Sequence, residues 1–253
     1  MDQEGVGVDR AAPDSDWSGT LTVHEHLRRA ILQGEYAADV PISQVRLASQ
    51  LGISRTPLRE ALRMLQAEGL IQSQANRMVR ITPMSLEDLE QVYAVRIVVE
   101  AMGASLSVPK LTDQDVAELA ASLARLEEVS RLSDLEDWET RHRQFHHLVR
   151  RHAGERLDAI AQSLSDHSGR YRRLYLTDGS ARITAATAEH RNVLDAASRR
   201  DGGLAADLIA RHLARTALID AAQIAPERDP LLVRQALWFA LGRTGTPGTG
   251  SEA

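Results

Sequence analysis

The sequence predicts a mainly α-helical fold in two parts: an N-terminal unit that ends in two short strands, and an antiparallel all-helical bundle. Three observations support this. Apolar residues recur at helical spacing through most of the chain. Aromatic residues make up only 4% of the composition, while alanine and leucine are abundant, which favours helices over strands. After Pro83 the pattern changes from short elements to long helices only.

The composition limits the classes of protein that the chain can belong to. Hydrophobic residues account for 43% and charged residues for 26%, as in an ordinary globular protein. The sequence contains no run of eighteen apolar residues, so it predicts no membrane span. The absence of cysteine excludes disulfides, thiolate zinc sites and cysteine nucleophiles. Residues 1–18 are polar and unlike a signal peptide, so we expect a disordered leader and a cytoplasmic location.

The first unit has the order helix, helix, tight turn, helix and two-strand wing. We expect helices over 21–32 and 43–50, and a third from a cap at Ser54 to about Ala67. In the second of these, Val45, Leu47, Ala48 and Leu51 are expected to face the core. Gly52 stands where a left-handed residue ends the second helix. Extended pieces are expected at 70–73 and 78–82, with a polar turn between them. This order is typical of a winged helix-turn-helix, which we assign to residues 19–83.

Charge and spacing in this unit point to nucleic acid. Residues 21–83 carry eight arginines against five acidic side chains, a net charge of +3, and the rest of the chain carries −8. Arg55 and Arg59 share one helix face, and a guanidinium can hold guanine bidentately, so both are candidates for base readout. The hydroxyls of Ser54 and Thr56 suit phosphates. Candidates for contacts to the DNA backbone or minor groove are Arg46, Asn76 and Arg77.

A solvated amphipathic helix, with arginines for solubility, is the alternative for any single one of these positions.

In the second part, long amphipathic segments suit an antiparallel bundle. We expect these helices at 85–107, 112–130, 134–152, 155–176, 181–200, 203–224 and 230–241.

Four histidines in the second part have spacings that can bring them together. His142 and His146 are four residues apart and face one side of a helix. His190 and His212 lie on two helices joined at Gly202, roughly 18 and 14 Å from the bend at ~1.5 Å per residue. If those helices pack antiparallel, four imidazoles converge, as at a metal site. The alternative is that each histidine is a surface residue or a satisfied core residue.

The first unit closely resembles the head of the GntR family of regulators. The residues that carry the resemblance are LASQLGISRTPLREALR at 47–63 and EGLI at 68–71. The resemblance implies contacts to DNA from Ser54, Arg55, Thr56, Pro57 and Arg59, with Asn76 near the wing tip. Two positions depart from the family pattern. The usual wing-tip glycine is replaced by Asn76-Arg77, and an arginine that some relatives use aligns with Val45.

The second part resembles the FCD-type effector domain of that family's FadR branch. Residues 96–100 match its R-x-x-x-E motif, and E-H-x-x-V-L-x-A at 189–196 and R-H-L at 211–213 match its metal-binding histidines. The family's aspartate position holds His142, which either replaces the aspartate as a ligand or marks a degraded site. The resemblance implies a divalent transition metal, zinc or nickel, held by His142, His146, His190 and His212. Candidate residues for binding an effector are Arg96, Tyr171, Arg172 and Tyr175.

The combined expectation is a ligand-responsive transcription regulator, by default a repressor, and not an enzyme. Its expected partners are a palindromic double-stranded operator, a small carboxylate effector and a second copy of the chain, with no membrane. A metal-containing helical-bundle enzyme is one alternative, although no HExxH motif supplies a general base. A regulator with a purely structural metal is another. We assign 84–226 to the effector-binding and dimerisation domain, and 227–253 to a terminal helix and flexible tail.

Overall fold

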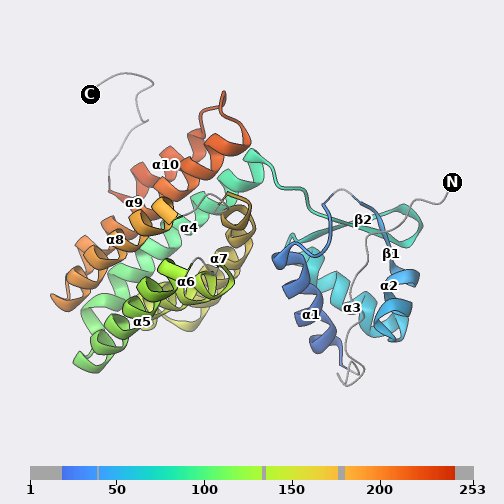
Figure 1. The fold of residues 1–253 in the computed structure, drawn as a ribbon, viewed down its shortest axis with the longest axis horizontal. Coiled ribbons are helices and arrows are strands. Elements are labelled where there is room, and N and C mark those ends of the chain that lie inside the picture. Colours follow the sequence, from blue (N-terminus) through green and yellow to red (C-terminus); the bar gives the residue numbers. More distant parts are fainter. Residues whose placement is uncertain (1–18, 39, 133–134, 176–179, 243–253) are drawn as a thin grey trace. The chain divides into compact units, whose positions relative to one another are not determined.

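The computed structural model describes residues 19–38, 40–132, 135–175 and 180–242 (Figure 1). The expected leader and the last residues of the expected tail lie outside these ranges. The chain divides into two compact units between Met84 and Ser85, and each is described by itself. The predicted fold class is confirmed, because helices dominate and the one described sheet is small and lies in the first unit.

The first unit is built on three helices. They are α1 (Thr20–Gln33), α2 (Gln44–Leu51) and α3 (Arg55–Ala67). Their apolar faces form one core with the sheet, in which Val23, Leu58 and Leu65 are fully buried. Gly52 ends α2 at φ 66°, a left-handed conformation that glycine adopts without a steric penalty. This allows the tight turn that sends the chain directly into α3.

A three-stranded antiparallel sheet forms the wing. Its strands are β1 (Ile42–Ser43), β2 (Ile71–Gln74) and β3 (Met78–Ile81), in the order β1-β3-β2. Strand β1 was not predicted, because a two-residue strand has no detectable period. The prediction that Val45 faces the core is wrong, because its side chain is 54% exposed. Leu47 and Ala48 supply the buried face of α2 instead.

The second unit is a bundle around a central helix, α4 (Leu86–Ser107). Around it lie α5 (Asp113–Leu132), α6 (Leu135–Arg150), α7 (Glu155–Tyr175), α8 (Ser180–Ser198), α9 (Gly202–Ile224) and α10 (Leu231–Ala240), with a short 3-10 turn at Val108–Lys110. The central helix packs against α6, α7, α9 and α10, while α5 packs against α6 and α8 (Figure 1). Ser85 caps α4 by accepting a hydrogen bond from the Asp88 backbone N–H at 3.1 Å.

The central helix is unusually apolar because it is surrounded. With the following turn it is long and apolar enough to cross a membrane by length and composition alone, and 61% of that apolar stretch is buried inside the bundle. A buried helix of this kind has apolar residues on most sides. The polar side chains that it does bury, Arg96 and Glu100, therefore need partners within the bundle.

Candidate nucleic-acid interface and histidine cluster

The third helix presents its polar face and its N-terminus to solvent. Leu58, Leu62 and Leu65 are buried, which places Arg55 and Arg59 on the opposite, exposed face. Ser54 occupies the N-cap position with an extended backbone, but its side chain makes no capping hydrogen bond within the described residues. The hydroxyl and the first backbone N–H groups of α3 are therefore available to an anion such as a phosphate.

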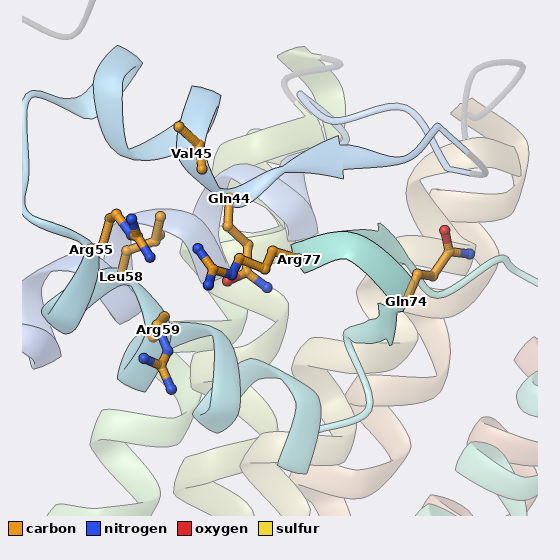
Figure 2. A pocket seen from close by; sticks show the side chains of 7 residues that line it. All are labelled: Gln44, Val45, Arg55, Leu58, Arg59, Gln74 and Arg77. Carbon is orange, nitrogen blue, oxygen red and sulfur yellow. The ribbon is translucent and has the colours of Figure 1, made fainter.

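A groove of about 370 Å³ lies between this helix, α2 and the wing. The residues that line it are Gln44, Val45, Arg55, Leu58, Arg59, Gln74 and Arg77. Figure 2 shows Arg55 and Arg59 one turn apart on α3, with Arg77 extending from the wing toward Gln44. Three guanidinium groups and two amides line the groove, and no carboxylate does. This composition suits a polyanion that also offers base edges.

The structure brings together some of the predicted DNA-binding residues and leaves others at the edge. Arg55, Arg59 and Arg77 line the groove. Ser54, Thr56 and Asn76 are exposed, Pro57 is half-buried in the first turn of α3, and Arg46 is exposed on α2 without lining the groove. Sequence reasoning did not single out Gln44 and Gln74. Their signal was weak, because a glutamine in a short element, half-buried like Gln44 or exposed like Gln74, is common.

The wing tip has an unusual backbone. Asn76 and Arg77 both have positive φ, 60° and 59°. Asparagine tolerates this left-handed conformation, whereas for arginine it is unfavourable by roughly 1 kcal/mol or more. The missing wing-tip glycine thus leaves a charged side chain where the backbone favours glycine, and that side chain points into the groove.

In the second unit, the four predicted histidines converge. His142 and His146 come from α6, His190 from α8 and His212 from α9. All four are buried, and one nitrogen from each lies within 4.8 Å of the others. The similar distances of His190 and His212 from the bend at Gly202 predicted that the two side chains meet, and their ring centroids are 4.6 Å apart.

The donor set fits a divalent transition ion. The Nε2 atoms of His146 and His190 are 3.2 Å apart, close to the separation of two nitrogens that share one ion at ~2.0–2.1 Å each. Buried Nδ1 of His142 has no hydrogen-bond partner among the described residues, which is costly for a polar atom without a ligand. His142 also stacks on the buried indole of Trp138, with centroids 4.7 Å apart.

Two carboxylates hold imidazoles from outside the cluster. Nδ1–H of His146 donates to Glu100 at 2.9 Å, and Nδ1–H of His212 donates to Glu189 at 2.7 Å. In each case Nε2 is left for the centre of the cluster. Carboxylates in this position orient metal-binding histidines in many proteins. Neither carboxylate was predicted as a partner, because Glu100 and His146 are 46 residues apart in sequence.

Burial keeps the imidazoles neutral. It lowers the pKa of His146 to about 4, although Glu100 opposes the shift. The pKa of His142 is well below its usual value, chiefly because the side chain is buried and in addition because neighbouring imidazoles and Arg172 disfavour its charge. Burial is also the largest cause of the low pKa of His190. Neutral imidazole is the form that binds a metal ion. The cluster is therefore ready to bind an ion at neutral pH without first losing protons.

The predicted effector residue Arg96 lies fully buried beside this cluster. Its Nε donates to Glu100 at 2.7 Å, and its Nη1 donates to Ser168 at 2.6 Å. Nη2 has no hydrogen-bond partner among the described residues. Burial alone would raise the pKa of Glu100, but Arg96, His146 and Arg150 hold it well below its usual range. Arg96 therefore has one donor to offer.

The other predicted effector residues lie differently. Arg172 is buried and pairs with both carboxylate oxygens of Glu139, so its guanidinium is already engaged. Tyr171 hydrogen-bonds Ser85 and Asp88 through its hydroxyl, at the first turn of α4. That is twelve residues, or roughly 18 Å, from Glu100 along the helix. The Tyr171 hydroxyl therefore lies near the N-terminus of α4, away from the carboxylate that holds His146, and the side chain of Tyr175 is not among those described.

The comparisons with known proteins match both units. Residues 20–81 match the bacterial regulatory proteins of the gntR family, and residues 91–215 match the FCD domain. The chain belongs to the GntR family. It is thus a DNA-binding transcription regulator with an FCD effector domain, and not an enzyme.

Individual relatives support the assignment. The HTH-type transcriptional repressor GlaR of Escherichia coli is 28% identical over 77% of this chain and 92% of its own length. The regulator YdhC of Bacillus subtilis is 27% identical over 42% of the chain, and the match spans only 48% of YdhC. In fold, Escherichia coli McbR/YncC superposes with a TM-score of 0.70 at 24% identity, over 81% of this chain and 97% of that one.

Proposed function

We propose that this regulator binds a palindromic operator as a homodimer in the cytoplasm, and that a small organic acid, bound at a metal held by four histidines, controls the affinity. The observation that carries the proposal is the four-imidazole cluster with an unpartnered guanidinium N–H of Arg96 beside it. We expect repression as the outcome, as in the relative GlaR, which is a transcriptional repressor.

The operator contact rests on the groove of the first unit. Arg55 and Arg59 occupy the N-terminal turns of α3, the end of a recognition helix that reads base edges in the major groove. Arg77 is positioned for the phosphate backbone or minor groove, as its place on the wing suggests. The amides of Gln44 and Gln74 extend the polar lining of the same groove.

The charge around the histidines favours an anionic effector. His142, His146, His190 and His212 would hold the ion, and a divalent ion supplies positive charge that no neutral imidazole offsets. Glu100 is shared by Arg96 and Arg150, and Glu189 pairs with Arg215. Arg150 also pairs with Asp158 at 2.8 Å, so these arginines are matched by carboxylates and the charge of the ion itself is left over. A carboxylate ligand would restore the balance and would accept the free N–H of Arg96.

A homodimer is supported by an apolar stripe on α4. Val95, Met102 and Leu106 are 47%, 53% and 45% exposed and share one face of the helix, with Val99 half-buried between them. Exposed apolar side chains in a continuous row are typical of a surface that pairs with another. A second copy is the natural partner, because two heads read the two halves of a palindrome.

The test measures binding of the purified, metal-loaded protein to DNA from upstream of its own gene, with and without chelator and with a panel of small carboxylates. We expect salt-dependent specific binding that one acid alters only when metal is present. Arg59→Ala should weaken specific binding about 10- to 100-fold, as expected for the loss of a bidentate base contact. Unchanged operator affinity in this variant, with its fold intact, would remove Arg59 from the interface.

A purely structural metal is the second candidate, favoured by one observation. Four buried nitrogen donors can by themselves complete the tetrahedral shell of a structural zinc site. In that case chelation lowers the thermal stability of the second unit, and no carboxylate changes operator affinity. In the effector-site case, the acid raises the melting temperature further in the presence of metal.

A further inference from the structure

Three side chains bear on which ion the histidine cluster accepts: His142 within it, and the carboxylates of Glu100 and Glu189 outside it. We propose that the site selects an ion of the nickel, copper(II) or zinc class and rejects magnesium and manganese, because His142 makes the donor set all nitrogen and Glu100 and Glu189 position two of the imidazoles. This inference rests on the proposed metal site and adds its selectivity and its positioning residues.

The donor chemistry gives the first step. All four side chains that converge are histidines, and no carboxylate oxygen belongs to the group. Imidazole suits zinc, copper and nickel, whereas magnesium and manganese prefer carboxylate, carbonyl and water oxygens. A carboxylate in place of His142 would add a hard, charged donor. The identity of residue 142 therefore decides how well a hard ion can compete.

The packing shows that His142 is built into the site. It is 2% exposed, stacks on Trp138 and lies 4.6 to 5.9 Å, between ring centroids, from the other three histidines. Its interplanar angle with Trp138 is 18°, so the indole limits rotation of the ring. The imidazole is thus held among aromatic rings, and no carboxylate of the described residues hydrogen-bonds it.

The two carboxylates give the second step. Glu100 from α4 and Glu189 from α8 each accept Nδ1–H of one histidine, which fixes the tautomer that offers Nε2. Glu189 is itself held by Arg215, whose Nη2 donates to Oε2 at 2.7 Å. These residues act through the imidazoles and are therefore positioning residues. A histidine that loses such a carboxylate becomes a weaker and less oriented donor.

The experiment uses the full-length protein after metal removal. The protein is equilibrated with equal concentrations of magnesium, manganese, nickel and zinc, and the bound ions are measured by mass spectrometry. A second sample with copper(II) is examined by electron paramagnetic resonance for nitrogen hyperfine structure. We expect about one nickel or zinc ion per chain, no uptake of magnesium or manganese, and copper bound by several nitrogens.

Three variants separate the steps. His142→Asp should lower the preference for nickel over manganese at least 10-fold and reduce the nitrogen hyperfine pattern. Glu189→Ala should weaken zinc binding about 10- to 100-fold, and Glu189→Gln, which keeps an acceptor for Nδ1–H, should recover part of the loss. Glu118→Ala, an exposed acid on α5 that pairs with Arg151, is the matched control and should bind metal as the parent does.

The outcomes distinguish this inference from the proposed function. An unchanged nickel-to-manganese ratio in His142→Asp would overturn the role of His142, and equal zinc affinities in Glu189→Ala and the parent would overturn the positioning role. Metal binding without selectivity would end the inference and leave the proposed site standing. A parent protein that binds operator DNA but none of these ions would end both the inference and the metal-dependent part of the proposed function.

Discussion

Arg77 combines an unfavourable backbone with a favourable charge. Its φ of 59° lies in the left-handed region, and its guanidinium lines the groove with Arg55 and Arg59. Strain that persists in a well-packed unit often accompanies a functional side chain. Glycine at this position would relax the backbone but would remove the charge. The residue is therefore a direct test of whether the wing contacts DNA.

Arg77→Gly and Arg77→Ala should separate the two effects. Both variants lose one phosphate contact, so we expect weaker operator binding and a salt dependence reduced by about one counterion. Only Arg77→Gly relieves the left-handed strain, so it should unfold no more easily than the parent and should be more stable than Arg77→Ala by about 1 kcal/mol. Fluorescence anisotropy at several salt concentrations and thermal unfolding provide the measurements. Equal salt slopes in all three proteins would place Arg77 away from the phosphates.

At the same scale, the sequence predicted those parts of the sites that depend on local spacing. His142 and His146 follow from a four-residue interval, and Arg55 and Arg59 from another. Apart from His190 and His212, whose distances from one helix bend predicted their meeting, contacts between helices could not be predicted in this way. Glu189 meets His212 across 23 residues, and Tyr171 meets Ser85 across 86, so only the packing of α7 against α4 shows where that tyrosine lies.

Among the elements, α4 and α9 approach unusually closely at the beginning of α9. A Cβ added to Gly202 would lie 2.7 Å from the backbone oxygen of Ser105 and 2.8 Å from Pro109. Backbone atoms cannot move away as a flexible side chain can. Gly203, one residue later, has room: its added Cβ would meet only the Asp201 carboxylate, at 3.6 Å. The pair of glycines therefore offers a matched comparison.

Gly202→Ala should destabilise the second unit, because either α9 or the end of α4 must shift. We expect a loss of about 1–3 kcal/mol in the free energy of unfolding, as for other overpacked sites. Gly203→Ala, in the first turn of α9, should leave stability unchanged or raise it slightly. Urea unfolding followed by circular dichroism gives both values. A tolerated Gly202→Ala would mean that the helices are less tightly apposed than the contact implies.

Long periodic elements were predicted well, and short ones were not. The central helix was expected over 85–107 and is found at Leu86–Ser107. By contrast, β1 contains only two residues and forms because its pairing with Val79 and Met78 completes the sheet. Val45 was misassigned for a related reason: α2 has only eight residues, and so its inward face is set by tertiary contacts more than by its period.

For the whole molecule, the metal-free protein should lose stability in mild acid. An unfolded histidine has a pKa near 6.5. The four buried histidines all have lower pKa values in the folded state, about 4 for His146, with burial as the largest cause. The unfolded chain therefore binds more protons as the pH falls from about 6.5 toward 4. The stability that is fully present above pH 6.5 is lost across this window.

Thermal unfolding of the metal-free protein between pH 7.5 and 4.5 tests this dependence. His146 alone should account for a loss on the order of 2 kcal/mol between pH 6.5 and 5. His146→Gln should flatten the pH profile, whereas Gln144→Ala, at an exposed position of the same helix, removes no titrating group and should leave its slope as in the parent. A parent profile that stays flat over the window would show that the imidazoles are not buried in the metal-free state.

The assembly can be tested through the α4 stripe. Met102→Asp places a charge in the middle of the exposed apolar row, so we expect monomers in analytical ultracentrifugation and operator binding weakened at least 10-fold. Ala120→Asp on α5, also at an exposed position, introduces the same charge elsewhere and should leave the dimer intact. A dimer that survives Met102→Asp would place the contact between subunits on another surface.

Trp138 gives this molecule a built-in optical reporter. Its indole is buried and stacked on His142, whereas the other two tryptophans of the chain are Trp17 and Trp238. Paramagnetic ions such as nickel and copper(II) quench the emission of an adjacent indole, while closed-shell zinc does not. With Trp17 and Trp238 changed to phenylalanine, occupancy of the histidine cluster becomes readable by fluorescence in real time, with no label on the protein.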